Sequence, residues 1–432
     1  MRRWRIFVGL LEVAGYFGRL TKALNEIGMP ADYFGLYDGH FYRWRERSGA
    51  NRGLERVLRK TYENIDYASR CLDRILLRLR FRCALALFFL ACVPRYDAFI
   101  FSAGASFFSG IELWLLRLLG KKILFVYLGS ESRPPYLNGI FLSSPQWKGY
   151  RHLLNYTREI SSRVRRQERV AHAVISHRES AQFLRNPFYD YLSVGYPVEL
   201  RTAEPEAERR RGGLRIVHAP SLPQIKGTPR IREMVEACSR IHSLEYVELV
   251  GKTNAEVLEQ LRNCDFVIDE LYSDSPLGGL AAEGASFGKP TLVSGYAQRM
   301  LPGEEGALRR WPPSEYCHPK ELEERFLRLV QDAEYRRLLG ADARAFLETQ
   351  WLPRCVARRV VRIIGGNAPA DWLACPRKVR YFHGYGIEEE ALRVRLREFI
   401  DKFGENALML SHNPALRTMI RDFAAGEGSR CE

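Results

Sequence analysis

Residues 264–290, CDFVIDELYSDSPLGGLAAEGASFGKP, carry the pattern that decides the fold. The apolar run Phe266–Asp269 ends in two carboxylates, Asp269 and Glu270, and is followed by a turn, two glycines and a helical stretch of small residues. A short buried strand that leads through a Gly-rich turn into a helix is typical of a parallel βαβ unit. In such sheets ligands bind beyond the carboxyl ends of the strands, near helix N-termini. The stretch therefore predicts an α/β fold and a ligand site together.

The same alternation extends along the chain in both directions and predicts two doubly wound, Rossmann-like halves. In the first half we expect strands at Arg5–Leu11, Ala31–Tyr37, Ala98–Ser102, Lys121–Leu128, Val170–Ser176 and Tyr191–Val194, with helices at Arg19–Ile27 and Ile111–Gly120. In the second half we expect strands at Leu214–Ala219, Tyr246–Val250, Phe266–Asp269 and Thr291–Ser294, with helices at Arg230–Arg240 and Ala255–Arg262. A long Arg-rich helical pattern follows at Ala341–Ile364.

Length and composition suggest where the domains begin and end. A chain of 432 residues predicts two domains at roughly 100–200 residues each. The charged, apolar-poor stretch 201–213, RTAEPEAERRRGG, predicts an exposed linker between a first domain at 1–200 and a second at 214–364 with closing helices. Residues 365–432 have no strong period, and we expect a C-terminal extension there, either a small appendage or a partly mobile tail.

The charge balance narrows the class of partner. Lys and Arg total 66 against 51 Asp and Glu, which gives a net charge of +15, and most of the basic residues are arginine. Arginine suits phosphates and anionic surfaces because its planar fork donates two parallel hydrogen bonds. The arginines recur throughout the chain rather than among aromatics on one segment, so we expect no nucleic-acid partner.

The cysteine and histidine patterns argue against a metal site and indicate a reducing compartment. The nine Cys are scattered without a C-x-x-C pair, and several lie inside apolar runs. The nine His show no metal-ligand spacing. The apolar N-terminal stretch contains Glu12, and we interpret it as a core strand rather than a signal peptide. The longest apolar run, Cys83–Val93, is shorter than the ~20 residues that span a bilayer. We therefore expect a cytoplasmic protein.

Two segments of the second half predict phosphate and ribose contacts. Gly278 and Gly279 would let backbone amides approach a phosphate at a helix N-terminus. Glu283, expected in the first turn of that helix, would accept hydrogen bonds from a ribose diol or would only complement the helix dipole. In APSLPQIKGT, residues 219–228, Lys226 would neutralise a diphosphate or would be a solvated loop lysine.

The first half supplies two weaker patterns. YLGSESRPP, residues 127–135, places Glu131 and Arg133 beside a flexible glycine at the carboxyl end of an apolar strand. Gly15 and Gly18 form an incomplete G-x-G-x-x-G, so a nicotinamide or flavin fingerprint is absent. The chain also lacks the G-x-x-x-x-G-K-[ST] pattern of P-loop NTPases.

Together these segments resemble the GT-B glycosyltransferases, and more closely the retaining enzymes of family 4. The resemblance covers residues 214–364, through HAPSLPQIKGT, YVELVGKTNAEVLEQLRNCDFVID and LGGLAAEGASFGKP, while the first half matches in layout only. It implies two Rossmann-like domains facing each other across a cleft, with a nucleotide-diphosphate sugar bound mainly by the second. It assigns the ribose to Glu283 and the diphosphate to Lys226. The donor-binding set that it implies is Gly15, Gly18, Ser221, Lys226, Gly251, Gly278, Gly279, Leu280 and Glu283.

The catalytic candidates follow from the same resemblance, with two departures from the family pattern. We expect them at Glu131, Arg133, Asp269, Glu270 and Ser275. Ser275 stands where the family usually has a second Glu that binds the transferred sugar, and Asp274 or the Asp269–Glu270 pair would have to replace it. Ser221 stands where an Arg is common.

The predicted function is transfer of a sugar from a nucleotide-diphosphate sugar to a glycan or polyprenyl-linked acceptor in cell-surface polysaccharide synthesis. We expect the reaction to be retaining and metal-independent, with no tightly bound cofactor. The alternative is a catalytically silent nucleotide-sugar-binding or partner subunit on the same fold.

A basic apolar segment adds an anionic membrane surface as a candidate partner. Residues 70–93, RCLDRILLRLRFRCALALFFLACV, place several Arg beside a dense apolar face. The segment would either dock on the inner face of the plasma membrane or form a core helix with an Arg-bearing outer face.

Overall fold

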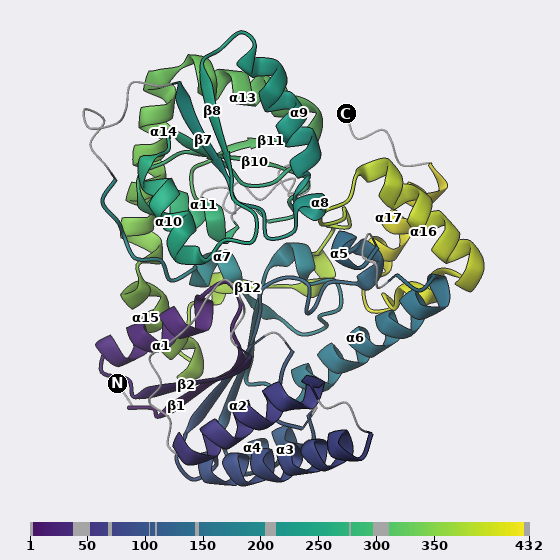
Figure 1. Ribbon diagram of the computed structural model, residues 1–432. Helices are drawn as coiled ribbons and strands as arrows, with labels where there is room; N and C mark the ends of the chain where they lie inside the picture. The colour runs from purple at the N-terminus through teal and green to yellow at the C-terminus, as the bar shows by residue number, and fades with distance from the viewer. Residues whose placement is uncertain are drawn as a thin grey trace.

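The computed structural model describes residues 3–37, 52–67, 71–102, 104–108, 110–142, 147–203, 213–275, 278–296 and 311–426. They form two α/β domains, each built on one sheet, that lie one above the other in Figure 1. This is the GT-B arrangement of two Rossmann-like domains that the sequence predicts. Nine residues of the predicted linker, 204–212, lie outside the described residues.

The first domain is built on a seven-stranded sheet of order β12-β6-β5-β4-β3-β1-β2. All neighbouring strands are parallel except β12, which runs antiparallel to β6. The strands are almost wholly buried, as expected for a parallel sheet covered on both faces. Their bounds are β1 Ile6–Leu11, β2 Ala31–Tyr37, β3 Ala98–Ser102, β4 Lys122–Tyr127, β5 Ala173–Ser176, β6 Phe188–Asp190 and β12 Leu373–Ala374.

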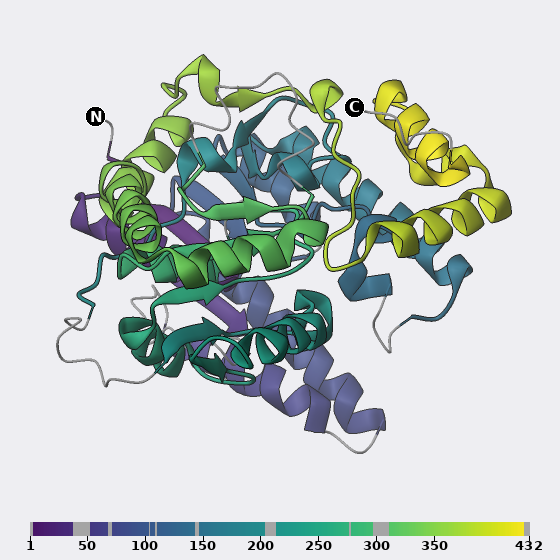
Figure 2. The ribbon, with the colours of Figure 1, turned by 90° about the horizontal axis from the view of Figure 1, so that it is seen from above.

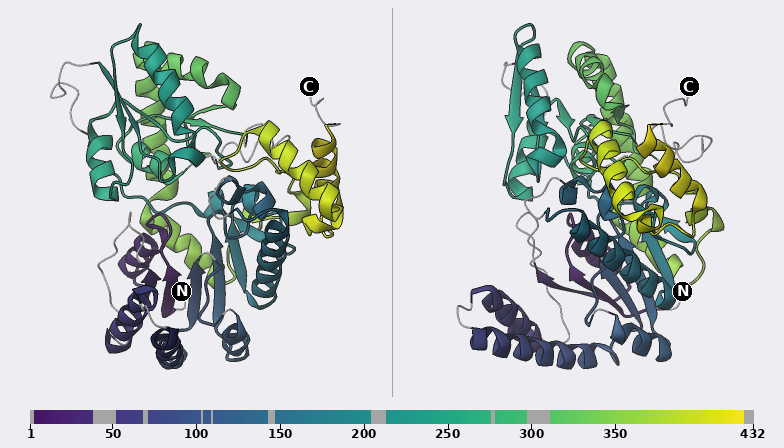
Figure 3. Two further views of the ribbon diagram at one scale, coloured as in Figure 1. Left: turned by 45° about the vertical axis from the view of Figure 1, so that its right-hand side comes forward. Right: turned by 90° about the vertical axis from the view of Figure 1, so that its right-hand side faces the viewer.

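Two separate hydrophobic clusters cover the two faces of this sheet. One contains side chains of α3, α4 and α6, and the other contains those of α1, α7 and the later helix α15. The helices of this part of the chain are α1 Tyr16–Glu26, α2 Arg52–Tyr67, α3 Cys71–Cys92, α4 Ile111–Leu118, α5 Gly139–Leu142, α6 Tyr150–Val170 and α7 Tyr191–Val194. Helices α2, α3 and α4 lie along the end of the first domain that is remote from the second (Figures 1 and 3).

The second domain is built on a five-stranded parallel sheet of order β11-β10-β9-β7-β8. Its strands are β7 Leu214–His218, β8 Leu244–Glu248, β9 Phe266–Ile268, β10 Thr291–Ser294 and β11 Glu315–Cys317. Its helices are α8 Pro223–Lys226, α9 Thr228–Ser239, α10 Asn254–Asn263, α11 Gly279–Ser286, α13 Leu322–Gln331 and α14 Ala333–Phe346. Thr253 and Glu256 form a capping box that fixes the start of α10.

After the second domain the chain returns to the first. The predicted helix at 341–364 is two helices, because the helical turns at Leu347–Trp351 end at Leu352 and α15, Pro353–Ile364, begins with a proline. Helix α15 packs against α1 in the shared core. Strand β12 then adds the last strand to the seven-stranded sheet.

Of the two alternatives for residues 365–432, the described residues form an ordered helical appendage rather than a tail. Helix α16, Glu389–Phe403, buries Leu392, Leu396 and Phe399 in the core that also holds α3 and α6. Helix α17, Pro414–Ala425, adds Leu416 and Ile420 to the same core. The two helices stand to one side of the second domain, beside α6 (Figures 1 and 2).

One predicted strand is also wrong. Tyr191–Val194 is a short helix, α7, because the Asp190 carboxylate accepts a hydrogen bond from the Leu192 amide and caps a helical turn there. The strand of this region, β6, lies just before it. The remaining predicted strands occur within three residues of their expected bounds. In the described part of the chain, no helix has the length and apolar character needed to cross a bilayer.

Candidate active site

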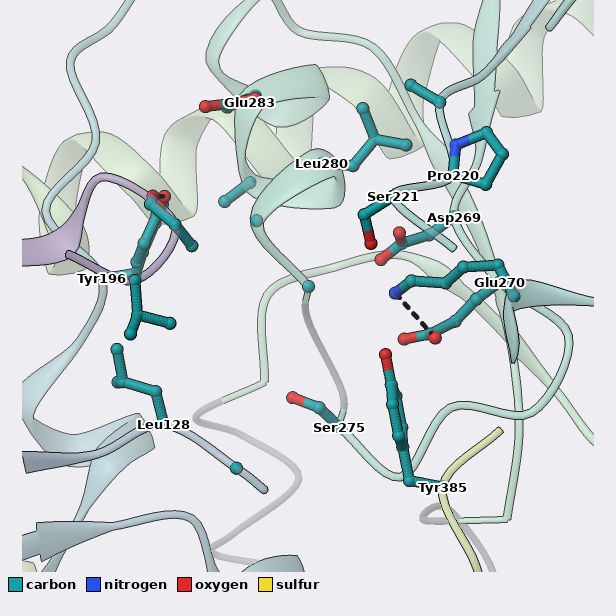
Figure 4. Close-up of a pocket in the computed structure, with 18 of the residues that line it drawn as sticks. Leu128, Tyr196, Pro220, Ser221, Asp269, Glu270, Ser275, Leu280, Glu283 and Tyr385 are labelled. Atoms are coloured by element: carbon teal, nitrogen blue, oxygen red, sulfur yellow. Dashed lines mark hydrogen bonds and ion pairs between the residues drawn. The ribbon is translucent and has the colours of Figure 1, made fainter. Parts of the chain in front are cut away.

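A cavity of about 510 Å³ lies between the two domains. Its walls are the loops that follow β1, β4 and β5 of the first sheet and β7, β8 and β9 of the second. The carboxyl ends of both sets of parallel strands therefore converge on one space, which is where α/β sheets place ligands. Most of the predicted site residues line it, namely Arg133, Ser221, Lys226, Asp269, Glu270, Ser275, Gly278, Gly279, Leu280 and Glu283. Figure 4 shows several of them around the open space.

Glu283 is held in place from both domains. Its carboxylate accepts two hydrogen bonds from Asn254 Nδ2, at 2.8 and 2.9 Å, and pairs with Arg19 Nη2 at 2.8 Å. Asn254 begins α10, whereas Arg19 belongs to α1 of the first domain. The prediction that Glu283 lies in the first turn of its helix is wrong, because α11 begins at Gly279 and Glu283 is one turn further on. Its partner Arg19 also donates to the Tyr196 hydroxyl at 2.8 Å.

Lys226 is a partly buried member of a charge cluster, with 14% of its side chain exposed, so the interpretation as a solvated loop lysine is wrong. It ends the short helix α8, and its Nζ lies 2.7 Å from Glu270 Oε2. Burial lowers the pKa of this amine, but the charges of Glu270, Tyr385 and Asp269 outweigh burial and hold the pKa well above its ordinary value. The lysine is therefore a fixed positive charge at the wall of the cavity.

The backbone amide of Gly278, which we expected to face a phosphate, donates instead to the Asp269 carboxylate. A Cβ at position 278 would lie 2.5 Å from Asp269 Oδ2. A side chain at position 278 would therefore require the Asp269 carboxylate to shift. Burial, with the nearby charges of Glu270 and Glu283, raises the pKa of Asp269 to about 6 against the opposing effect of Lys226. The Gly278 amide is thus occupied by an internal carboxylate.

In the glycine loop after β1, backbone amides likewise donate to an internal carboxylate, that of Glu12. Glu12 accepts hydrogen bonds from the amides of Gly18 and Phe17, at 2.8 and 3.2 Å, and so caps the N-terminus of α1. Burial raises the pKa of the Glu12 carboxyl to about 7. Glu12 lines the cavity, whereas Gly15 and Gly18 do not. Gly15 has φ 73°, a conformation that glycine tolerates.

Of the two residues predicted together in the loop after β4, Arg133 lines the cavity and Glu131 does not. Arg133 lines the cavity and forms a buried ion pair with Asp274 of the second domain. Glu131 lies outside the cavity lining, and burial raises the pKa of its carboxyl. Arg133 is therefore the member of this pair that faces the cavity.

Tyr385 reaches the cavity from the C-terminal segment and was not foreseen. Its ring centroid lies 4.8 Å from the Arg133 guanidinium and 5.6 Å from Lys226 Nζ. Its hydroxyl points toward Glu270 (Figure 4). The Tyr385 carbonyl accepts from the Gly139 amide at 2.7 Å, and the next amide, of Gly386, donates to Tyr272 O at 2.9 Å. One short segment thus bonds to both domains and delivers an aromatic ring between their cations.

The positions of the three remaining predicted residues are as follows. The Ser275 amide donates to Ser273 Oγ at 3.1 Å. Ser221 lines the cavity beside Asp269 (Figure 4). Gly251 lies in the turn between β8 and α10 with φ 69°, outside the cavity lining, although its neighbour Lys252 is part of it.

The balance of charge in the cavity is acidic. Five carboxylates line it, from Glu12, Asp269, Glu270, Asp274 and Glu283, against three cations, from Arg133, Lys226 and Lys252. Within the described ranges, no group of three or more His, Cys, Asp or Glu side chains is arranged to hold a metal ion.

Comparison with known proteins finds a partial sequence match and solved structures of similar fold. No family model matches the chain. An uncharacterized glycosyltransferase of Methanocaldococcus jannaschii is 28% identical over 134 residues, which are 30% of this chain and 36% of that protein. The match thus spans little more than a third of the relative. A solved α-glucosyltransferase in complex with UDP and a 13-mer DNA is 12% identical, with a TM-score of 0.50, over 84% of this chain and all of the other. The Anabaena protein HepE, solved with UDP and glucose, has a TM-score of 0.49 at 13% identity, over 84% and 100% of the two chains.

Proposed function

We propose that this protein is a glycosyltransferase that takes a nucleotide-diphosphate sugar in the cavity between its two domains. The observation that carries the proposal is the grouping of Glu283, Lys226 and the N-terminus of α11 at the carboxyl edge of the second sheet. A carboxylate suited to a ribose diol, a fixed ammonium and helix-terminal amides are the groups that a nucleoside diphosphate requires. The partial identity to a glycosyltransferase supports the same reaction class.

The proposed roles follow from the positions of the side chains. Glu283, positioned by Asn254, would hold the ribose diol, and Lys226 would hold the diphosphate together with the amides of Gly279 and Leu280. Ser221 and Gly251 would border the donor, and the Gly15–Gly18 loop would approach it from the first domain. Glu12 and Asp269 would give up the amides of Gly18 and Gly278 when phosphate binds there.

We further propose that the transfer is retaining and needs no metal ion. The diphosphate leaving group gains negative charge as its bond to the sugar breaks, and fixed cations stabilise such charge without reorganisation. Lys226 and Arg133 supply these cations at the cavity wall, and Tyr385 lies against both. Asp269, Glu270 and Ser275 would contact the transferred sugar, with Asp274 near the position of the family's missing second Glu. Glu131, which lies outside the cavity lining, would take part without direct contact to the sugar.

The acceptor that we propose is a glycan or a polyprenyl-linked glycan precursor in cell-surface polysaccharide synthesis, handled in the cytoplasm. The supporting observation for this compartment is the set of cysteines without disulfides in the described part of the chain. The acceptor would enter the cavity from the side of the first domain.

A ligand panel tests the proposal. UDP-, GDP- and ADP-sugars would be assayed by thermal shift and by release of the nucleoside diphosphate, with UDP-glucose first. We expect one base to raise the melting temperature and to support slow hydrolysis, because a ligand that binds the folded state stabilises it. Glu283→Ala should abolish both signals. Binding without any turnover, with a broad set of acceptors, would favour the silent binding subunit, and no binding by any nucleotide would refute the proposal.

A further inference from the structure

Helix α3 has two apolar faces, of which only one is buried. Leu85, Phe88, Phe89 and Cys92 pack into the core of the first domain. On the opposite face, Leu76, Leu79, Leu87 and Leu90 are each 57–60% exposed, and Cys83 between them is also exposed. Their spacing of three and four residues places them on one stripe of the helix. The sequence-based alternative of a core helix with an Arg-bearing outer face thus holds for the buried side and the exposed arginines, but the outer side also carries this apolar stripe.

Helix α4 continues the exposed apolar surface. Ile111 and Leu118 are 82% and 83% exposed, and Trp114 is 54% exposed. They lie at the spacing of successive turns, whereas Leu113 and Leu116 are buried on the other side of the helix. The rings of Phe89 on α3 and Phe108, just before α4, lie 5.7 Å apart, so the two helices are neighbours. Both lie at the end of the molecule remote from the second domain (Figures 1 and 3).

Positive charge borders this surface. Arg80 and Arg82 on α3 are exposed and flank the apolar stripe, whereas Arg78 projects from the opposite side of the helix. Lys121 follows α4 after two residues. Asp73 is the one exposed carboxylate among the described side chains of α3. A large exposed apolar patch marks an interaction site, and a basic border selects an anionic partner.

We propose that the outer faces of α3 and α4 form one docking surface for an anionic lipid bilayer. The leucines, Ile111 and Trp114 would enter the headgroup region, while the arginine heads reach lipid phosphates and their stems lie along the apolar stripe. The surface lies apart from the cavity, so lipid binding does not depend on the proposed transfer reaction. Its orientation would place the first domain, where the acceptor enters, next to the membrane.

Vesicle co-sedimentation tests the surface directly. Vesicles of phosphatidylcholine alone would be compared with vesicles containing equal parts of phosphatidylglycerol, at low and high salt. We expect the wild-type protein to bind the anionic vesicles, and Leu79→Asp with Leu87→Asp, or Ile111→Asp with Leu118→Asp, to weaken binding by about tenfold or more. Arg80→Gln with Arg82→Gln should weaken binding to anionic vesicles alone and reduce its salt dependence.

The matched control is Leu338→Asp, an exposed leucine of α14 in the second domain, which should leave vesicle binding unchanged. All variants would be checked for an unchanged melting temperature and for UDP binding, which report on folding and on the cavity. Wild-type protein that fails to bind anionic vesicles, or binding that survives both α3 and α4 pairs, would overturn the proposal. So would light scattering that shows a stable dimer separated by the same substitutions, because a second copy would then cover the surface.

Discussion

Arg133 of the first domain and Asp274 of the second form an ion pair across the cavity in which both side chains are at least 95% buried. The pair lies where the two domains meet, and the Tyr385 ring lies 4.8 Å from the Arg133 guanidinium. The contact between the two domains therefore buries two opposite charges, one from each domain, against each other.

Removal of one partner of this pair should be strongly destabilising. Asp274→Ala leaves the Arg133 charge buried and unpaired, and we expect a loss of about 3–5 kcal/mol in the free energy of unfolding. The double change Arg133→Met with Asp274→Leu should lose much less, because no lone charge remains. Denaturant titration measures both. Glu334→Ala, which breaks the exposed pair with Arg337, is the control and should leave the free energy of unfolding nearly unchanged. Equal losses for the single and double variants would contradict the argument.

Glu283 should be essential for nucleotide binding. Glu283→Ala removes the acceptor of the ribose hydrogen bonds, and we expect affinity for the matching nucleoside diphosphate to fall by about 2–3 kcal/mol in calorimetry. Asn254→Ala should produce a smaller loss, since it only positions the carboxylate. Glu259→Ala, an exposed acidic residue of the same helix α10, is the control. An unchanged affinity after Glu283→Ala would rule out the ribose assignment.

Lys226 should matter for the diphosphate and not for the nucleoside. In Lys226→Ala we expect UDP affinity to fall by at least about tenfold, because a charged hydrogen bond to phosphate is lost, while uridine binds as before. Lys252→Ala, the more exposed cation of the cavity, should have a smaller effect on UDP. If Lys226→Ala weakens both ligands equally, its role is structural, through Glu270.

Donor binding should weaken as pH rises. The free protein holds Asp269 and Glu12 with pKa values of about 6 and 7, both raised mainly by burial. A bound diphosphate adds negative charge, raises both pKa values further and so draws protons in. The stabilising effect is fully present below pH 6 and is lost as pH rises through 6–8. UDP-glucose affinity by calorimetry should fall by about threefold to tenfold across this range. Asp269→Asn should flatten the profile, and a profile that rises with pH would disprove the coupling.

The sequence predicted the strands well because buried parallel strands are local patterns. Ala31–Tyr37, Ala98–Ser102 and Thr291–Ser294 have the predicted bounds, since each is a short apolar run closed by turn residues. Tyr191–Val194 has the same apolar character but follows a carboxylate that caps a helical turn, and such runs are ambiguous by periodicity alone.

The site was predictable where a local strand-to-loop pattern marks it, as for Arg133 after β4, Lys226 after β7 and the segment after β9. The residues from Asp269 to Glu283 lie in one βα unit, and their order along the chain places them at the edge of the sheet. Arg19, Asn254 and Tyr385 come from elements far apart in sequence, and no local pattern marks them as partners. Glu12 was visible only as an acid in an apolar strand, with no signal that it would occupy the amides of the glycine loop.

The return of the chain after α14 has a consequence for synthesis on the ribosome. The second sheet is built from one continuous stretch, 214–317, whereas the first domain needs α15 against α1, β12 beside β6, and α16 in its core. Its N-terminal 200 residues emerge first with these surfaces uncovered. We therefore expect the usual order, in which the N-terminal domain folds first during translation, to be reversed here. The first domain would then complete its fold last, and until that point chaperones would be expected to bind its uncovered apolar sheet face.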